Sequence, residues 1–292
     1  MRNTIAALLF ISSISFYSPA WAVEGCVETA HLIVCDLSRG QLSNDRVEEL
    51  AHLAENKLQQ VLDFWAANGG IERRGKIHLE LDRPRGGTYG TQFRLLTKNG
   101  TRTRNVRVFG VKKEPQNLVH KLTVAVFPSP DKLIRNMVGG PMEARFGNRM
   151  SFPMCGFSSD SWVLSLRRIG AYIRLAELGP AHEPWGMTTG RDGWPYVTDE
   201  WRQHIAYAEA VSFGDYLLVT YGPEMMKAFY RLAHLDNVRP WARIFGKTLT
   251  ELEEEWTTHL ESSQVTDEKE NRATAELLAK GPGKTCPARL GD

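Results

Sequence analysis

The chain has 292 residues, of which 42% are hydrophobic and 24% charged, and its formal net charge is +2. This composition suits a globular protein with a sizeable core. The near balance of charges gives no indication of a nucleic acid or a polyanionic surface as partner. Beyond the N-terminal region no segment approaches about 18 uninterrupted apolar residues, so we expect no helix that spans a membrane.

The first 22 residues have the pattern of a secretion signal. Arg2 supplies a positive charge, residues 5–16 form a mainly apolar stretch, and Ala20-Trp21-Ala22 matches an A-x-A cleavage site. We therefore expect a signal peptide at 1–22 and a mature chain that starts at Val23. This predicts an exported protein, either periplasmic or secreted.

Four cysteines follow the expected cleavage site, namely Cys26, Cys35, Cys155 and Cys286. An even number in an oxidising compartment indicates two disulfides, and four cysteines allow three pairings. We favour Cys26–Cys35, which closes a short N-terminal segment, and Cys155–Cys286, which would attach the C-terminal tail. A C-x-x-C pair is absent from the sequence, so we expect the cysteines to be structural.

The first half of the chain alternates between strand-like and helix-like patterns. Residues 47–66 repeat apolar side chains at i, i+3 and i+4, and residues 77–81 alternate apolar and polar side chains. The expected elements are strands at 23–36 (with its apolar part at 31–35), 77–81 and 106–111, and helices at 47–66 and 118–126.

The second half is predominantly helical in its pattern. A helix is plausible at 131–143, but Gly139-Gly140-Pro141 predicts a break inside it. The other expected helices lie at 161–178, 201–221, 223–235, 241–245, 249–262 and 268–280. This order predicts an α+β fold, in which a small N-terminal β-sheet with helices precedes a mainly helical C-terminal half.

Residues 118–126 have the frame of a zinc-protease helix without its chemistry. In His-Glu-x-x-His, two histidines four residues apart bind zinc from one helical face, and the glutamate is the general base. Here His120 occupies the first ligand position, Lys121 the position of the base, and Val124 the second ligand position.

Three segments further along the chain add to this pattern. Residues 207–217 match Tyr-x-x-x-x-Ser-Phe-x-x-Tyr-Leu, residues 221–224 match Tyr-Gly-x-Glu, and residues 245–256 end in Gly-Lys-Thr-Leu-Thr-Glu-Leu-Glu-Glu-Glu-Trp. With the order of elements, they make residues 45–260 similar to the bacterial peptidase-MA-like (gluzincin-type) domains. The resemblance implies a zincin-like fold. It divides the chain into the signal peptide, a degenerate peptidase-MA-like domain at 23–262, and a polar tail at 263–292.

The resemblance also shows which parts of the catalytic site are missing. Shortly after the histidine helix, the family supplies a glutamate as third zinc ligand, and Gly139 falls at that position here. His120 is then the one ligand left, and a single imidazole cannot hold zinc, which needs three or four protein ligands. We therefore expect a pseudoenzyme without a cofactor, although zinc is expected in the family.

A rebuilt metal site is the alternative. Glu143 lies four residues after Gly139, and in a continuous helix it would sit about 6 Å further along, at about 1.5 Å per residue. With His120 it is a weak candidate for a metal ligand. The neighbouring His182 and Glu183, and the pair Glu200 and His204, are further weak candidates.

Two other features suggest binding. The loop that follows residue 180 contains Trp185, Trp194, Tyr196 and Trp201, which form either a sugar- or peptide-binding platform or a cover for the edge of the core. Lys121 in a former active-site cleft predicts either a salt bridge or an anion-binding cleft.

Three functions are compatible with these patterns. The first is a non-catalytic peptide- or protein-binding module of the cell envelope, which would bind a segment between the sheet edge and the His120 helix by strand addition. The second is a metal-dependent hydrolase or peptidase with an atypical zinc site. The third is an envelope assembly component that acts as a scaffold. We expect an envelope protein or peptide as partner, and no nucleic acid.

Overall fold

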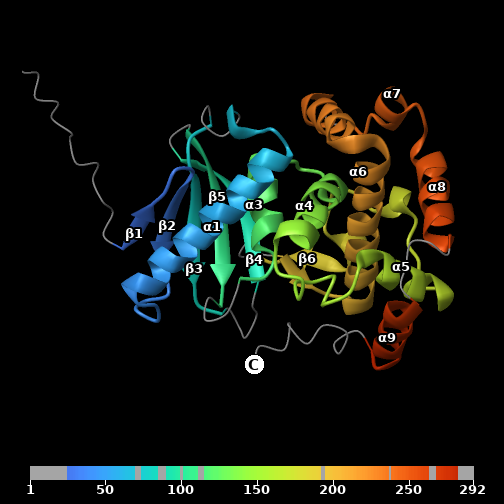
Figure 1. The fold of residues 1–292 in the computed structure, drawn as a ribbon, viewed down its shortest axis with the longest axis horizontal. Coiled ribbons are helices and arrows are strands. Elements are labelled where there is room, and N and C mark those ends of the chain that lie inside the picture. The colour runs from blue at the N-terminus through green and yellow to red at the C-terminus, as the bar shows by residue number, and fades with distance from the viewer. Residues whose placement is uncertain are drawn as a thin grey trace, which may run out of the picture.

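The computed structural model describes residues 25–69, 74–84, 90–98, 101–110, 115–191, 195–236, 238–262 and 268–281. An N-terminal sheet with helices is followed by a mainly helical C-terminal half (Figure 1), as the sequence predicts. The expected signal peptide, Trp194 and Cys286 lie outside the described residues. Within these ranges no helix is long and apolar enough to cross a membrane.

The sheet is mixed and has five described strands in the order β1-β2-β3-β5-β4. The three central strands are parallel, while β1 and β4 are antiparallel strands at the two edges. Their bounds are β1 Cys26–Glu28, β2 Leu32–Asp36, β3 Ile77–Asp82, β4 Gly90–Lys98 and β5 Thr101–Phe109. The sequence predicts the three central strands, although β5 begins five residues earlier than expected. It does not predict β4, whose mixed polar sequence lacks a clear alternation.

One face of the sheet carries the N-terminal core. Alternate residues of β3 are buried there, with α1 (Asn44–Phe64) and α3 (Leu118–Val126) packed over them. In Figure 1, α1 runs diagonally across this face. Leu58 of α1 and Leu122 of α3 belong to the same buried cluster as Leu79 of β3.

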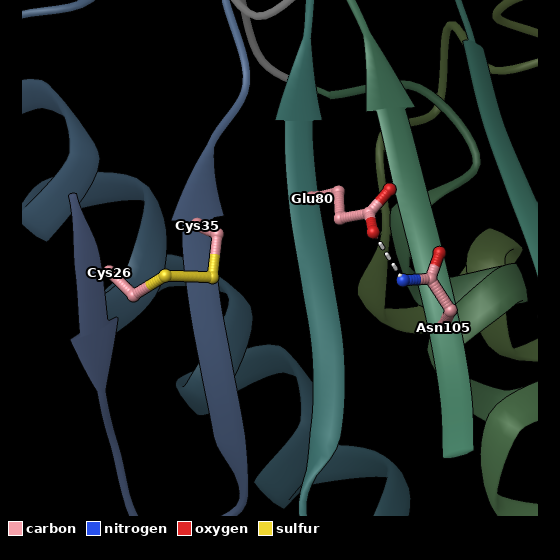
Figure 2. The surroundings of a disulfide bond; sticks show 4 residues. All are labelled: Cys26, Cys35, Glu80 and Asn105. Carbon is pink, nitrogen blue, oxygen red and sulfur yellow. Dashed lines mark hydrogen bonds between the residues drawn. A yellow bond between two sulfur atoms is a disulfide. The ribbon is translucent and has the colours of Figure 1, made fainter. Parts of the chain in front are cut away.

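On the opposite face, the side chains of β3 are polar. Glu80 of β3 accepts a hydrogen bond of 2.7 Å from the side chain of Asn105 on β5 (Figure 2). The predicted disulfide between Cys26 and Cys35 is confirmed, and it joins β1 to β2 at paired positions. Cys155 is also disulfide-bonded, and its pairing with Cys286 remains a prediction because Cys286 is outside the described residues.

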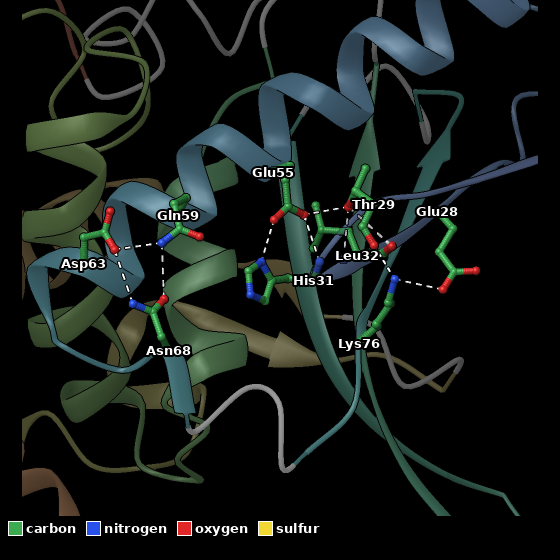
Figure 3. Close-up of polar contacts among 9 residues, drawn as sticks. All are labelled: Glu28, Thr29, His31, Leu32, Glu55, Gln59, Asp63, Asn68 and Lys76. Carbon is green, nitrogen blue, oxygen red and sulfur yellow. Dashed lines mark hydrogen bonds and ion pairs between the residues drawn. The ribbon is translucent and has the colours of Figure 1, made fainter.

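A polar cluster attaches the turn between β1 and β2 to α1 (Figure 3). The Glu55 carboxylate accepts hydrogen bonds from the Thr29 hydroxyl at 2.6 Å and from the His31 backbone N–H at 3.1 Å. Its Oε1 also lies 2.5 Å from Nδ1 of the His31 ring. These contacts link the sheet edge to the helix that covers it.

In the described part of the C-terminal half, six α-helices pack around a second buried cluster. These are α4 Lys132–Phe146, α5 Ser159–Arg168, α6 Glu200–Asp236, α7 Trp241–Phe245, α8 Leu249–Glu261 and α9 Glu268–Ala279. The long α6 has a non-helical residue at Gly222, with φ of 80°. The two helices predicted on either side of that residue are therefore confirmed.

The helix predicted at 161–178 is wrong in its second half, because α5 ends at Arg168. Gly170 has a φ of 73°, which a helix does not accommodate. Beyond it, two buried carboxylates accept backbone N–H groups that a helix would otherwise use. Glu209 accepts from Ile173, and Glu253 accepts from Leu175, both at 3.0 Å.

The predicted break at residues 139–141 is also wrong, because α4 continues through Pro141 to Phe146. The glycines allow close packing instead. A Cβ at Gly140 would lie 2.2 Å from a methyl group of Val211 on α6, and a Cβ at Gly214 would lie 2.3 Å from the carbonyl oxygen of Met137 on α4. Small residues on both helices therefore let their backbones approach closely.

Candidate functional site

The four positions that the resemblance singles out lie together. His120, Lys121 and Val124 are on α3, and α3 packs against α4, which contributes Gly139 (Figure 1). A Cβ at Gly139 would lie 2.2 Å from Cδ2 and 2.9 Å from Nε2 of the His120 ring. His120 is 2% exposed, and its Nε2 has no hydrogen-bond partner among the described protein atoms.

A pocket of about 330 Å³ opens beside these positions, and we call it the α3–β4 pocket. It is lined by residues 91–94 of β4, by residues of α3 and α4, and by α6. Side chains of the two-stranded hairpin β6 (Met187–Thr189) and β7 (Pro195–Val197) also line it. Successive residues of a strand point to opposite faces, so four consecutive lining residues mean that the edge of β4 borders the pocket.

The lining of the α3–β4 pocket is positively charged. It includes Lys121 of α3, Lys132 and Arg135 of α4, and Arg94 of β4, but no Asp or Glu among its described residues. Within the described part of the chain, Lys121 and Arg135 make no ion pair or hydrogen bond through their side chains. The cationic groups thus converge from three elements without a carboxylate between them.

Lys132 is 3% exposed, and its ammonium contacts a histidine, a thioether and two aromatic rings. Its Nζ lies 3.2 Å from Nδ1 of His182 and 2.9 Å from the sulfur of Met187. It also lies 5.0 Å from the ring centroid of Trp185 and 5.1 Å from that of Tyr207. Aromatic faces and a histidine therefore partly replace the counter-ion that a buried ammonium usually has.

The pKa values in the pocket shift in the direction that removes positive charge. Burial lowers the pKa of Lys121 to about 7, and Arg135 adds to this shift. Burial also lowers the pKa of Lys132 to about 7, with contributions from Lys121 and Arg135. For His120, burial and then the neighbouring Lys121 and Arg135 hold the pKa well below its usual range, so the ring is neutral.

Glu143 lies under the N-terminus of α3, away from the pocket lining. Its Oε1 accepts hydrogen bonds from the backbone N–H groups of Asn117 and Asn148 and from the Ser151 hydroxyl at 2.7 Å. Its Oε2 accepts the N–H of His120 at 2.9 Å. This carboxylate satisfies donors that are otherwise unpaired at a helix start, a role that a side chain at the N-cap usually has.

A zinc ion does not fit the residues that are present. The Val124 side chain is aliphatic, Gly139 has no side chain, and the Glu143 carboxylate is held by the donors described above. Lys121 and Arg135 would bring positive charge toward the ion. Among the described residues, no group of three or more His, Cys, Asp or Glu side chains is arranged to hold a metal.

The other weak candidates for metal ligands are divided between buried and exposed positions. His204 is buried and packs on the rings of Trp162, at 4.6 Å, and Phe152, at 5.3 Å, whereas Glu200 is exposed. His182 lines the α3–β4 pocket beside Lys132, and the neighbouring Glu183 is exposed.

The loop aromatics are distributed between core and surface. Trp185 is 0% exposed, and its Nε1 donates to the carbonyl of Gly179 at 2.9 Å. Trp201 is half-buried against the helical core, while Tyr196 is 46% exposed. Trp185 therefore contributes to the core and to the surroundings of Lys132, and it cannot belong to a surface platform.

A larger hollow of about 800 Å³ lies between α5, α8 and α9. One of its arginines, Arg167, is paired with Glu261 at 3.1 Å. We take the α3–β4 pocket as the candidate site because His120, Lys121 and Val124 line it.

Lys132 and Arg135 are the site residues that sequence reasoning missed. They lie three residues apart and therefore share a helix face, but nothing in their local sequence points to a site. A scan against protein-family models and searches of curated proteins and of solved structures find no match to this chain. The function has to be inferred from the chemistry of the pocket.

Proposed function

We propose that this chain is a degenerate zinc-peptidase-like domain that binds a peptide or protein segment without cleaving it. The zincin-like fold, the assignment to the peptidase-MA-like family and the envelope location are parts of this proposal. The segment binds in the groove between the edge of β4 and α3.

The observation that carries the proposal is the placement of positions 120, 124 and 139. His120 and Val124 line the α3–β4 pocket, and the His120 ring packs on Gly139. These residues come from two helices, and the resemblance assigns all three to zinc ligands. Their meeting supports a zincin-like arrangement of α3 and α4, while their chemistry leaves one imidazole beside cationic groups. Without a bound metal, nothing lowers the pKa of an attacking water toward neutrality.

Contacts between the other segments of the resemblance give further support. Ser212 of α6 accepts a hydrogen bond of 3.0 Å from Nε1 of Trp256 on α8, and the Phe213 and Trp256 rings lie 5.5 Å apart. Tyr221 donates to Glu255 at 3.2 Å. The matched segments thus form one packed unit, which is what a shared family fold predicts.

The position of β4 supports the mode of binding. Among the described strands β4 pairs only with β5, so its second edge is oriented toward the pocket. An extended peptide can add to such an edge through main-chain hydrogen bonds, with adjacent pockets that select its side chains. The Cys26–Cys35 disulfide supports an oxidising location outside the cytoplasm.

Metal content and peptide turnover test the proposal together. The purified chain is assayed for zinc and is incubated with a pool of N-acetylated, C-amidated random hexapeptides. We expect less than stoichiometric zinc, and we expect peptides that are retained on immobilised protein and recovered at full length. Stoichiometric zinc that is lost in His120→Ala, or peptide cleavage that a chelator abolishes, would instead establish the rebuilt metallohydrolase.

A further inference from the structure

The α3–β4 pocket combines a strand edge with a cluster of basic side chains, and its described lining contains no Asp or Glu. We infer that the basic part of this pocket binds a carboxylate of the bound peptide, supplied by its C-terminus or by an acidic side chain. This inference rests on the proposed peptide binding and assigns to it the chemical group that is recognised.

The geometry supplies three cations from two helices. Lys121 projects from α3, and Lys132 and Arg135 lie one turn apart on α4. The carboxylates nearest in sequence are engaged elsewhere. Asp131 forms a two-point ion pair with Arg239, at 2.6 and 3.1 Å, and Glu143 accepts the donors at the start of α3.

Burial makes this arrangement unfavourable without an anion. Burial and the proximity of like charges both raise the free energy of the charged forms of these side chains. The lowered pKa values of Lys121 and Lys132 reflect this cost. A carboxylate in the pocket would replace repulsion by attraction and by charge-assisted hydrogen bonds. The pocket is therefore electrostatically prepared for a negative group.

Several features favour a peptide carboxylate over a phosphate. The edge of β4 offers backbone hydrogen bonds to an extended chain, which a free phosphate cannot use. Phe93, Val124 and Val197 line the same pocket, and its volume of about 330 Å³ exceeds the need of a single anionic group. The planar guanidinium of Arg135 matches the two oxygens of a carboxylate.

A competition between matched peptide pools tests the inference. The first pool contains N-acetylated random hexapeptides without Asp or Glu and with a free C-terminal carboxylate. The second has the same sequences with a C-terminal amide, and the third is the amide pool with one Glu in each peptide. Equal amounts are applied to immobilised full-length protein, and retained peptides are quantified by mass spectrometry.

We expect the first or the third pool to be retained at least tenfold better than the second. Preference for the first identifies the C-terminal carboxylate, and preference for the third identifies an acidic side chain. Arg135→Gln and Lys121→Gln should each reduce the preference toward parity, whereas Arg149→Gln, an exposed arginine outside the pocket, should leave it unchanged. Unfolding temperatures show whether each variant is folded.

The outcomes separate this inference from the proposed function. Equal retention of all three pools would overturn the carboxylate while peptide binding stands. If no pool is retained, both fail. Stabilisation by inorganic phosphate, without any preference among the peptide pools, would also overturn the carboxylate assignment.

Proton uptake gives a second measurement. At about pH 8 an anion raises the pKa of Lys121 and Lys132, so binding takes up protons, and calorimetry of the most enriched peptide in buffers of different protonation enthalpy detects this uptake. The titratable and charged groups around the pocket are His120, Lys121, Asp131, Lys132, Arg135, Glu143, His182, Glu183, Arg94 and Tyr207. Binding without proton uptake would contradict the involvement of the two lysines.

Discussion

The imidazole of His120 packs directly against the backbone of Gly139, so that a single methyl group at residue 139 would lie 2.2 Å from the ring. In the resembling family, these two positions provide the first and third zinc ligands. Here the pair has become a packing contact between α3 and α4. The absence of a side chain at 139 is therefore a requirement of this contact.

Gly139→Ala tests this contact. In an unobstructed helix, alanine would be favoured over glycine by up to about 1 kcal/mol. Here the added methyl group meets a fully buried ring, and overpacking of this kind costs about 1–3 kcal/mol. We expect a lower unfolding free energy in denaturant titrations, with partial recovery in the double variant with His120→Ala.

Gly69→Ala is the matched control, because a Cβ at Gly69 would meet nothing within 4 Å and its φ is not left-handed. It should leave the unfolding free energy nearly unchanged. Equal stability of Gly139→Ala and the wild type would show that the two helices are further apart than described.

The Ser151 side chain supports the buried carboxylate of Glu143. Its hydroxyl donates to Glu143 at 2.7 Å and accepts the backbone N–H of Asn117 at 2.9 Å. Ser151→Ala removes both hydrogen bonds and leaves the carboxylate with fewer donors. Since hydrogen bonds to charged groups contribute about 1.5–3 kcal/mol, we expect a loss in this range. Ser262→Ala, at an exposed helix end, is the control and should change stability by less than about 0.5 kcal/mol.

The sequence predicts the order of elements better than it predicts contacts between them. The periodicity at 47–66 and the alternation at 77–81 arise from burial on one face, and both elements are present. The predicted break at Gly139-Gly140-Pro141 is wrong. Local helix propensity does not show which neighbouring residue packs against a glycine. The helix continues through this segment because Gly139 packs against His120 and Gly140 packs against Val211.

For the candidate site too, local patterns are predicted from the sequence and contacts between elements are not. The helix motif predicts that His120, Lys121 and Val124 share one region, because their spacing alone fixes a helix face. Lys132 and Arg135 line the pocket because α4 packs against α3. The strand β4 borders the pocket because it is an edge strand of the sheet. Those relations are set by long-range packing, which a local pattern does not encode.

The Cys26–Cys35 disulfide closes a loop with a sequence separation of 9. In the chain-entropy account, a loop of this size stabilises the folded state by about 2.5–3 kcal/mol. We expect the double variant Cys26→Ala/Cys35→Ala to unfold at a lower temperature than the wild type. Under reducing conditions the wild type should lose stability, whereas the double variant should lose only what the Cys155 disulfide contributes. A double variant as stable as the oxidised wild type would show that this disulfide does not constrain the unfolded chain.

Glu55 makes stability depend on acidity. Burial alone would raise its pKa, but hydrogen bonds from Thr29 and His31 outweigh burial and lower it below the usual 4.5. A carboxylate with a lowered pKa stabilises the fold above the unfolded-state pKa, and this contribution is lost as the pH falls through the folded-state value. Glu55→Gln should therefore be less stable than the wild type at neutral pH, by about 1 kcal/mol.

The difference between Glu55→Gln and the wild type should shrink as the pH is lowered below 4.5, as followed by thermal unfolding at several pH values. Glu48→Gln, at an exposed residue of the same helix, is the control for the loss of one carboxylate from α1. A difference that stays constant with pH would mean that the ionised form of Glu55 is not preferentially held by Thr29 and His31.

Lys132 should destabilise the fold at neutral pH, because its surroundings hold a neutral amine more readily than an ammonium. Its pKa falls from 10.5 to about 7 through burial and through the nearby Lys121 and Arg135, while Glu183 opposes the shift. In this range the unfolded chain binds more protons than the folded chain, so stability rises with pH between the two values. Lys132→Met, which suits the rings of Trp185 and Tyr207, should therefore be more stable than the wild type at pH 7.

The gain from Lys132→Met should be a few kcal/mol at most, since each unit of pKa shift corresponds to about 1.4 kcal/mol and the contact with His182 is lost. It should diminish as the pH rises through 10.5, above which the amine is neutral in both states. Urea titrations across this range measure the difference. Lys132→Met should also bind carboxylate-bearing peptides more weakly. In the wild type, a bound carboxylate should offset the loss of stability that the buried ammonium causes. If Lys132→Met were less stable than the wild type at every pH, the ammonium would have a counter-ion and the pocket would carry no excess of positive charge.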